Sequence, residues 1–219
     1  MPSYPWAWMS PTSPMTKSNS YSADKSLPDP AERPYVSRGG SKLAAALDRF
    51  GIDPDGWVCA DLGSNVGGFV DCLLGHGAKR VYAVDTGYGA LAYKLRIDPR
   101  VAVHERTNAM HVTLPEPADL VTIDTGWTRQ AHVLPNAIKM LKPDGRIITL
   151  IKPHYEARPD QVRGGVLDPA AARSMLTEIL DRIRAASPYV ERVIESPITG
   201  HKGNIEFLAL LSPTISLHL

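Results

Sequence analysis

One stretch decides the fold: Asp61-Leu62-Gly63-Ser64-Asn65-Val66-Gly67-Gly68-Phe69. It follows the apolar run 57–60 and leads into the apolar segment 69–74, so we expect a strand, a glycine-rich turn and a helix. Glycine has no Cβ, and the backbone of such a turn can therefore approach a bound ligand closely. The stretch predicts a pocket of the kind that binds nucleotides.

Outward from this stretch, predicted strands and helices alternate along the chain. A first helix should begin with Ser41 as its N-cap and end at Gly51. Strands are expected at 58–61, 81–85, 101–104, 120–124 and 146–151, and helices at 68–74, 90–95, 132–141 and 169–186. Two last strands, 190–194 and 205–211, have no helix between them and predict an antiparallel hairpin at the sheet edge. Alternation of this kind requires an α/β fold, here a mostly parallel seven-stranded sheet with helices on both faces.

Length and composition fit one α/β domain with flanking segments. The chain has 219 residues, of which 43% are hydrophobic and 21% charged, and its net charge is +1. Two cysteines indicate a reducing compartment. There is neither an apolar run near the roughly 20 residues of a membrane helix nor a basic segment followed by an apolar one at the N-terminus. We therefore expect a cytoplasmic protein that makes no membrane contact.

The chain divides into three segments by composition. Residues 1–33 are rich in Ser, Pro and Thr and show no helical or strand period, which predicts disorder. Residues 34–212 form the expected domain, and 213–219 a short tail. The seven histidines show no metal-ligand spacing, so we predict no metal.

Candidate binding residues gather where parallel strands end. Asp61, Asp85, Asp124 and Lys152 each fall at the carboxyl end of a predicted strand, where ligands of such sheets bind. Asp85 is placed to accept the hydroxyls of a ribose, and Asn108, after the third strand, to meet an adenine edge. The glycine turn itself supplies further candidates: Gly63, Ser64, Asn65, Gly67, Gly68 and Phe69.

The chemistry of the turn favours one ligand class over others. Its pattern is Gly-x-x-x-Gly-Gly, neither the dinucleotide pattern nor a phosphate-binding loop, and it contains no Lys or Arg. Asp61 would repel a pyrophosphate and suits a ligand with an ammonium and a sulfonium group. S-adenosyl-L-methionine is therefore the expected cofactor, and an NAD-dependent oxidoreductase stays as an alternative.

Six blocks of the sequence resemble one known family. Residues 35–43, 61–69, 83–85, 95–101, 151–157 and 196–207 look, in order, like the TlyA-type haemolysin and ribosomal-RNA methyltransferases, whose catalytic domain is FtsJ-like. The resemblance implies a Rossmann-like class I methyltransferase over 34–212. It also implies methylation of ribose 2′-hydroxyls in RNA, with ribosomal RNA as the expected substrate and S-adenosyl-L-methionine as donor.

The resemblance also implies a catalytic tetrad, carried over block by block. Its members are Lys42, Asp124, Lys152 and Glu206. A ribose hydroxyl is a weak nucleophile, so its proton needs a base within reach. Lys152 would serve if burial and the neighbouring Lys42 lowered its pKa, while the two acids orient the lysines.

Two departures from the family keep other functions open. The small RNA-binding domain that usually precedes residue 38 is replaced here by about 33 residues, and the block 125–128 differs beside the expected target nucleotide. Trp127 in that block is a candidate for stacking on a base. A methyltransferase with a small-molecule or protein acceptor, and a non-catalytic RNA-binding or membrane-acting relative, remain alternatives. The sequence gives no indication of the oligomeric state.

Overall fold

The computed structural model describes residues 34–126, 128–185 and 188–213. The segment 1–33, nearly all of the 213–219 tail and Trp127, on which predictions were made above, lie outside these residues. Among the described residues no helix is both long and apolar enough to cross a membrane.

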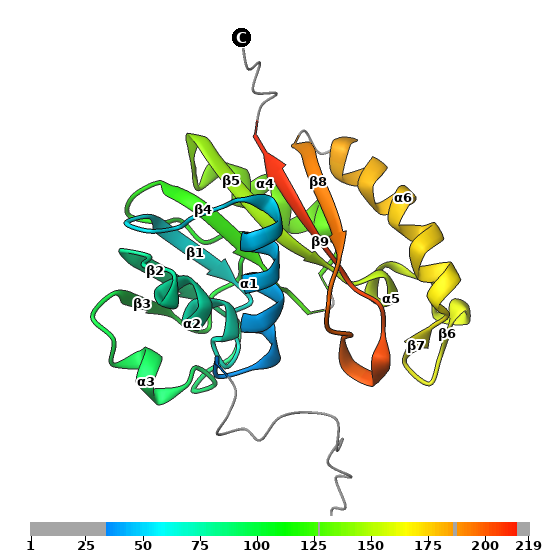
Figure 1. The fold of residues 1–219 in the computed structure, drawn as a ribbon, viewed down its shortest axis with the longest axis horizontal. Coiled ribbons are helices and arrows are strands. Elements are labelled where there is room, and N and C mark those ends of the chain that lie inside the picture. The colour runs from blue at the N-terminus through cyan, green and yellow to red at the C-terminus, as the bar shows by residue number, and fades with distance from the viewer. Residues whose placement is uncertain (1–33, 127, 186–187, 214–219) are drawn as a thin grey trace, which may run out of the picture. The chain divides into compact units, whose positions relative to one another are not determined.

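Seven strands form the sheet, in the order β3-β2-β1-β4-β5-β9-β8 (Figure 1). Five of them run parallel, and β9 is antiparallel to both β5 and β8. The mostly parallel sheet with an antiparallel hairpin at its edge is confirmed. The strands are β1 (Val58–Leu62), β2 (Arg80–Val84), β3 (Val101–His104), β4 (Ala118–Ile123), β5 (Leu141–Ile151), β8 (Tyr189–Glu195) and β9 (Phe207–Ser212).

Helices cover both faces of the sheet, as expected. The helices α1 (Arg38–Phe50) and α2 (Gly68–Gly75) pack on one face, and α4 (Gln130–Lys139) and α6 (Pro169–Ala185) on the other (Figure 1). Alternate side chains of a strand point to opposite faces, so each strand feeds two cores. In β2, Val81 and Ala83 pack with α1 and α2, while Tyr82 and Val84 pack on the side of α4 and α6.

The start of α1 differs from the prediction. The helix begins at Arg38, with Ser37 at the N-cap position, and Ser41 lies inside it. Its first turn contains two glycines, Gly39 and Gly40, which are poor helix formers. Packing explains their presence, because a Cβ on Gly40 would lie 2.7 Å from the carbonyl oxygen of Gly68 at the start of α2. The glycines thus allow α1 to approach α2, while Gly51 ends the helix in the left-handed region as predicted.

Several short elements were not predicted. They are the helix α5 (Pro153–Glu156), the 3₁₀ turns Pro159–Gln161 and His201–Gly203, and a two-stranded ribbon of β6 (Val162–Arg163) and β7 (Val166–Leu167). The helix expected at 90–95 is present as the shorter α3 (Tyr93–Arg96). The strand β5 also begins five residues before its expected start. The ribbon and the His201–Gly203 turn lie at the same end of the sheet (Figure 1), and both contribute to a cavity discussed below.

Candidate active site

The glycine turn after β1 lies directly against the loop after β4. Gly63 has a φ of 90°, and a Cβ there would be 2.6 Å from the carbonyl oxygen of Asp124. Gly67 also has a positive φ, of 95°, and a Cβ on it would collide with Leu95 of α3. Only glycine fits these two positions without strain. The turn therefore has a fixed place beside Asp124.

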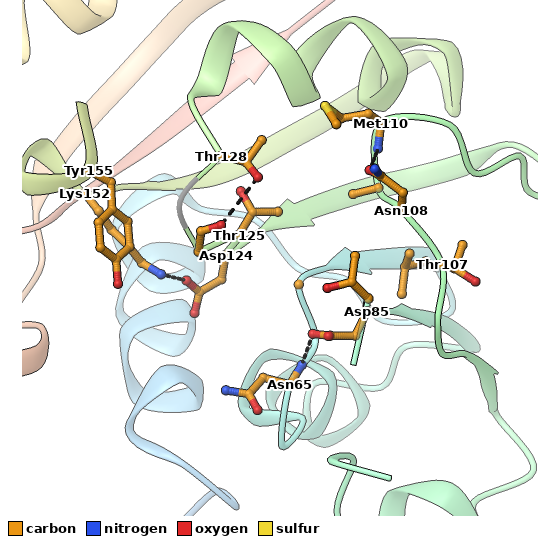
Figure 2. A pocket seen from close by; sticks show the side chains of 15 residues that line it. Asn65, Asp85, Thr107, Asn108, Met110, Asp124, Thr125, Thr128, Lys152 and Tyr155 are labelled. Carbon is orange, nitrogen blue, oxygen red and sulfur yellow. Dashed lines mark hydrogen bonds and ion pairs between the residues drawn. The ribbon is translucent and has the colours of Figure 1, made fainter. Parts of the chain in front are cut away.

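A cavity of about 440 Å³ opens above the carboxyl ends of β1, β2, β4 and β5 (Figure 2). Its volume falls within the range of about 300–1,000 Å³ typical of small-molecule sites. Asp85 and Asn108 line one end of it, and Asp124 and Lys152 line the other. The structure thus brings together four residues that the sequence placed on separate strands and loops.

Asp85 follows β2 and organises the backbone around it. Its Oδ2 accepts a hydrogen bond of 2.8 Å from the backbone N–H of Asn65, and its Oδ1 accepts one of 2.6 Å from that of Gly87. Each carboxylate oxygen keeps a second lone pair for a ligand hydroxyl. Asn108 starts the turn on the opposite wall, where its Oδ1 accepts the N–H of Met110 at 2.9 Å.

A smaller recess of about 180 Å³ continues from this cavity between α1 and the glycine turn. Ser64, Gly68, Phe69, Lys42 and Asp61 are among its lining residues. Phe69 is only 2% exposed and packs mainly in the core between α1 and α2. Little of its side chain is therefore open to a ligand.

Asp61 lies within β1 and is almost fully buried. Its Oδ1 accepts a hydrogen bond of 2.7 Å from the hydroxyl of Thr122 on β4. Burial raises the pKa of Asp61 to about 8 against the lowering effect of that bond, and the nearby Asp124 and Asp85 raise it further. The sequence predicted a charged anchor at this position. With a pKa of about 8 the carboxyl group is instead mostly protonated at pH 7.

The four residues of the implied tetrad meet as two ion pairs. The Nζ of Lys42, on α1, lies 2.5 Å from Oε2 of Glu206, which directly precedes β9. The Nζ of Lys152, after β5, lies 2.5 Å from Oδ1 of Asp124, after β4 (Figure 2). Both side chains of the first pair are at least 90% buried. Asp124 lines both the main cavity and the recess, so the tetrad lies where the two join.

The charge state of Lys152 differs from what the sequence suggested. Burial lowers the pKa of Lys152, but the adjacent Asp124 and then Glu206 raise it more, so that it ends above its ordinary value. Burial likewise raises the pKa of Asp124 against the effect of Lys152 and Lys42. The lowered pKa that the sequence analysis set as the condition for Lys152 to act as a base is therefore not found. Lys152 rests as an ammonium group held by Asp124.

Other lining residues were not singled out from the sequence. Thr125 and Tyr155 both face the main cavity (Figure 2), and the hydroxyl oxygen of Thr125 is buried without a hydrogen-bond partner among the described residues. The ring of Tyr155 lies 5.5 Å from the Nζ of Lys152. Thr125 directly follows Asp124, and Tyr155 comes three positions after Lys152. This closeness in sequence to the tetrad could have identified both as candidate site residues.

The site fits a nucleoside cofactor that carries a cationic amino-acid part. The glycine turn leaves a cradle that side chains would fill, Asp85 retains free lone pairs, and Asp61 closes the recess with an ionisable acid. No Lys or Arg side chain lies in the turn 61–69 to neutralise a pyrophosphate. Across the described residues, no group of three or more His, Cys, Asp and Glu side chains is arranged to hold a metal ion.

The comparisons with known proteins agree on one family. The family model described as FtsJ-like methyltransferase matches residues 35–212. The 16S/23S rRNA (cytidine-2′-O)-methyltransferase TlyA of Mycobacterium tuberculosis is 41% identical over 187 residues, which cover 83% of this chain and 69% of TlyA. YqxC of Bacillus subtilis is 42% identical over 80% of this chain, but the match spans only 64% of YqxC.

A solved structure shares the fold closely. The crystal structure of a candidate hemolysin from Lactococcus lactis superposes with a TM-score of 0.79 at 36% identity, covering 83% of this chain and 89% of that one. Methyltransferase structures at 16% identity show the same fold at lower similarity.

Proposed function

This chain belongs to the FtsJ-like methyltransferase family, and from that premise we propose that it methylates ribose 2′-hydroxyls of ribosomal RNA with S-adenosyl-L-methionine. One observation carries the proposal: the Lys42–Glu206 and Lys152–Asp124 pairs converge where the main cavity meets the recess below the glycine turn. A ribose hydroxyl needs such groups because it is a weak nucleophile near neutral pH.

The residues that would hold the cofactor divide between the two hollows. Asp85 would accept the ribose hydroxyls and Asn108 would meet the adenine edge in the main cavity. Ser64, Gly68 and the acid of Asp61 would surround the amino-acid part in the recess. Bound there, S-adenosyl-L-methionine supplies an electrophilic methyl group. Gly63, in both linings, would set the distance from the cofactor to Asp124.

The Lys152–Asp124 pair would handle the hydroxyl proton. Burial opposes both charges of the pair, raising the pKa of Asp124 and counteracting the rise in that of Lys152. The ion pair is the resting state, and passing the ammonium proton across 2.5 Å to Asp124 would leave a neutral amine and a neutral acid, a transfer whose cost burial lowers. The amine of Lys152 would then accept the proton of the ribose hydroxyl. Lys42, held by Glu206, would orient the hydroxyl oxygen.

Two measurements test the proposal. Calorimetry should show binding of S-adenosyl-L-methionine and none of NAD; the reverse result would end the assignment of the cofactor. Methyl transfer from labelled S-adenosyl-L-methionine to ribosomal RNA, read by mass spectrometry of digested nucleosides, should yield a 2′-O-methylnucleoside.

A pair of lysine variants sharpens the second measurement. Lys152→Ala should reduce kcat about 100-fold or more, the usual contribution of a positioned base. Lys139→Ala, an exposed lysine at the end of α4, should leave kcat unchanged. Undiminished transfer by Lys152→Ala would remove that residue from the mechanism.

A further inference from the structure

A second large cavity adjoins the cofactor cavity at Tyr155. It measures about 540 Å³, and Tyr155 lines both. Its other walls come from α5, from the segment 159–165 that includes β6, and from the turn 201–204 before β9. The two hollows share one aromatic residue, three positions after Lys152. A molecule in this second cavity would therefore lie next to the tetrad without occupying the place of the cofactor.

The walls of this cavity are held by specific hydrogen bonds. The buried Asn204 accepts the N–H of Leu167 at 3.0 Å through its Oδ1, and its Nδ2 donates to the carbonyl oxygens of Gly165 and His201, each at 2.9 Å. Lys202 adds a bond of 2.7 Å from its Nζ to the carbonyl oxygen of Gly164. These bonds join two loops far apart in the sequence, so the cavity is a built feature of the fold.

His154 lines this cavity and carries one ring nitrogen without a hydrogen-bond partner among the described residues. This nitrogen, Nδ1, is buried. Burial, followed by the charges of Lys152, Lys42 and His201, lowers the pKa of His154 to about 4. The imidazole is therefore neutral at pH 7 and carries one donor and one acceptor nitrogen. Its ring lies 4.2 Å from that of Tyr155, tilted by 50°.

The remaining lining is suited to a flat, partly polar molecule. Ala157, Pro159 and Val162 supply apolar wall, and Tyr155 supplies an aromatic ring. The ammonium group of Lys202 uses one proton on Gly164 and retains others for a ligand acceptor. A nucleobase combines these properties: it has an apolar face that stacks on aromatic rings and an edge of alternating donors and acceptors.

We propose that this cavity receives the heterocyclic base of the nucleotide that is methylated, with Tyr155 stacking on the base and His154 reading its edge. This inference rests on the proposed RNA acceptor and adds where the base binds and which residue distinguishes one base from another. A base placed there would leave its own ribose beside Lys152. Removing a base from a stacked RNA costs free energy, which stacking on Tyr155 would offset.

Nucleotide titration of the full chain tests the inference directly. Protein with ¹⁵N-labelled histidine is first saturated with S-adenosylhomocysteine, so that nucleotides do not enter the cofactor cavity. The four ribonucleoside 5′-monophosphates are then added, and the histidine ring nitrogens are followed by NMR. The signal of His154, identified by its loss in His154→Leu, should shift with at least one nucleotide. Nucleotides that bind without shifting it, or that do not bind at all, would overturn the inference.

Variants separate base reading from catalysis. Tyr155→Leu should weaken binding of all four nucleotides about tenfold. His154→Leu should instead reduce the difference in affinity among them, by about the factor of five to ten expected for one hydrogen bond. His132→Leu, an exposed histidine on α4, should do neither.

The two proposals can fail separately. If RNA methylation is absent but nucleotides still shift His154, only the proposed function falls. If methylation proceeds and both pocket variants keep the wild-type KM for RNA, the base cavity is wrong while the proposed function stands.

Discussion

Replacing Asp61 by Asn should abolish a large pH dependence of stability. Asp61 is 1% exposed, and burial raises its pKa from 3.8 to about 8. Between these values the folded protein holds a proton that the unfolded chain has released. The free energy of unfolding of the wild type should therefore fall as pH rises from about 4 to about 8. Asparagine cannot titrate, and its side-chain oxygen can still accept the hydroxyl of Thr122.

The size of the effect follows from the shift in pKa. A folded state that holds one more proton than the unfolded chain loses about 1.4 kcal/mol of stability per pH unit. Between pH 5 and pH 7 this amounts to about 3 kcal/mol, a substantial part of the 5–15 kcal/mol that stabilises a typical domain. The difference in stability between Asp61→Asn and the wild type should grow by that amount over the same interval.

Urea unfolding at pH 5, 6, 7 and 8 measures this difference. Other titrating groups contribute equally to both proteins, so the difference between their curves isolates Asp61. Asp53→Asn, at an exposed position, is the matched control and should follow the wild type. Parallel curves for Asp61→Asn and the wild type would show that Asp61 is already ionised in the folded protein and refute the reasoning.

Three further predictions concern the ion pairs and the glycine turn. Asp124→Asn removes the main group that raises the pKa of Lys152. NMR titration of the Lys152 Nζ should therefore show a pKa roughly 1–3 units lower in the variant than in the wild type. Gly200→Ala places a Cβ against Oε1 of Glu206, and by displacing this buried carboxylate it should cost about 3–5 kcal/mol in urea unfolding. Gly63→Ala, at a φ of 90° and 2.6 Å from a carbonyl oxygen, should reduce cofactor affinity at least tenfold in calorimetry.

Controls for the glycine variants come from the chain itself. A Cβ on Gly75 at the end of α2 would meet its nearest neighbour, the ring of Tyr35, at 3.9 Å, an ordinary contact distance. Gly75→Ala should therefore change stability by less than about 1 kcal/mol. An equal loss in Gly75→Ala and Gly200→Ala would show that the contact with Glu206 is not the cause. An unchanged Lys152 pKa in Asp124→Asn would mean that the two side chains do not pair in solution.

The sheet could be predicted because the pattern of apolar residues and the length of each segment identify the strands. β3 matched its expected range, and the hairpin of β8 and β9 followed from the absence of a helix between them. The positions of Asp85, Asp124 and Lys152 followed in turn, because ligands of parallel sheets bind at the carboxyl ends of strands. Local pattern and global topology agree for these elements.

Features that depend on tertiary packing could not be read from the pattern. The start of α1 depends on the approach of Gly40 to Gly68, about 28 positions away in the chain, and the neutral state of Asp61 depends on complete burial. The partnership of Lys42 with Glu206 joins residues 164 positions apart and was suggested only by the family resemblance. The β6–β7 ribbon is too short for a period to reveal.

The place of β9 in the sheet has a consequence for the synthesis of the protein. Although β8 is made first, β9 lies between it and β5, so β5 has an unpaired edge until β9 emerges. Glu206 directly precedes β9 and neutralises Lys42, which was made 164 residues earlier. A nascent chain can therefore form the glycine turn early, yet the four side chains of the proposed tetrad assemble only when the last strand inserts.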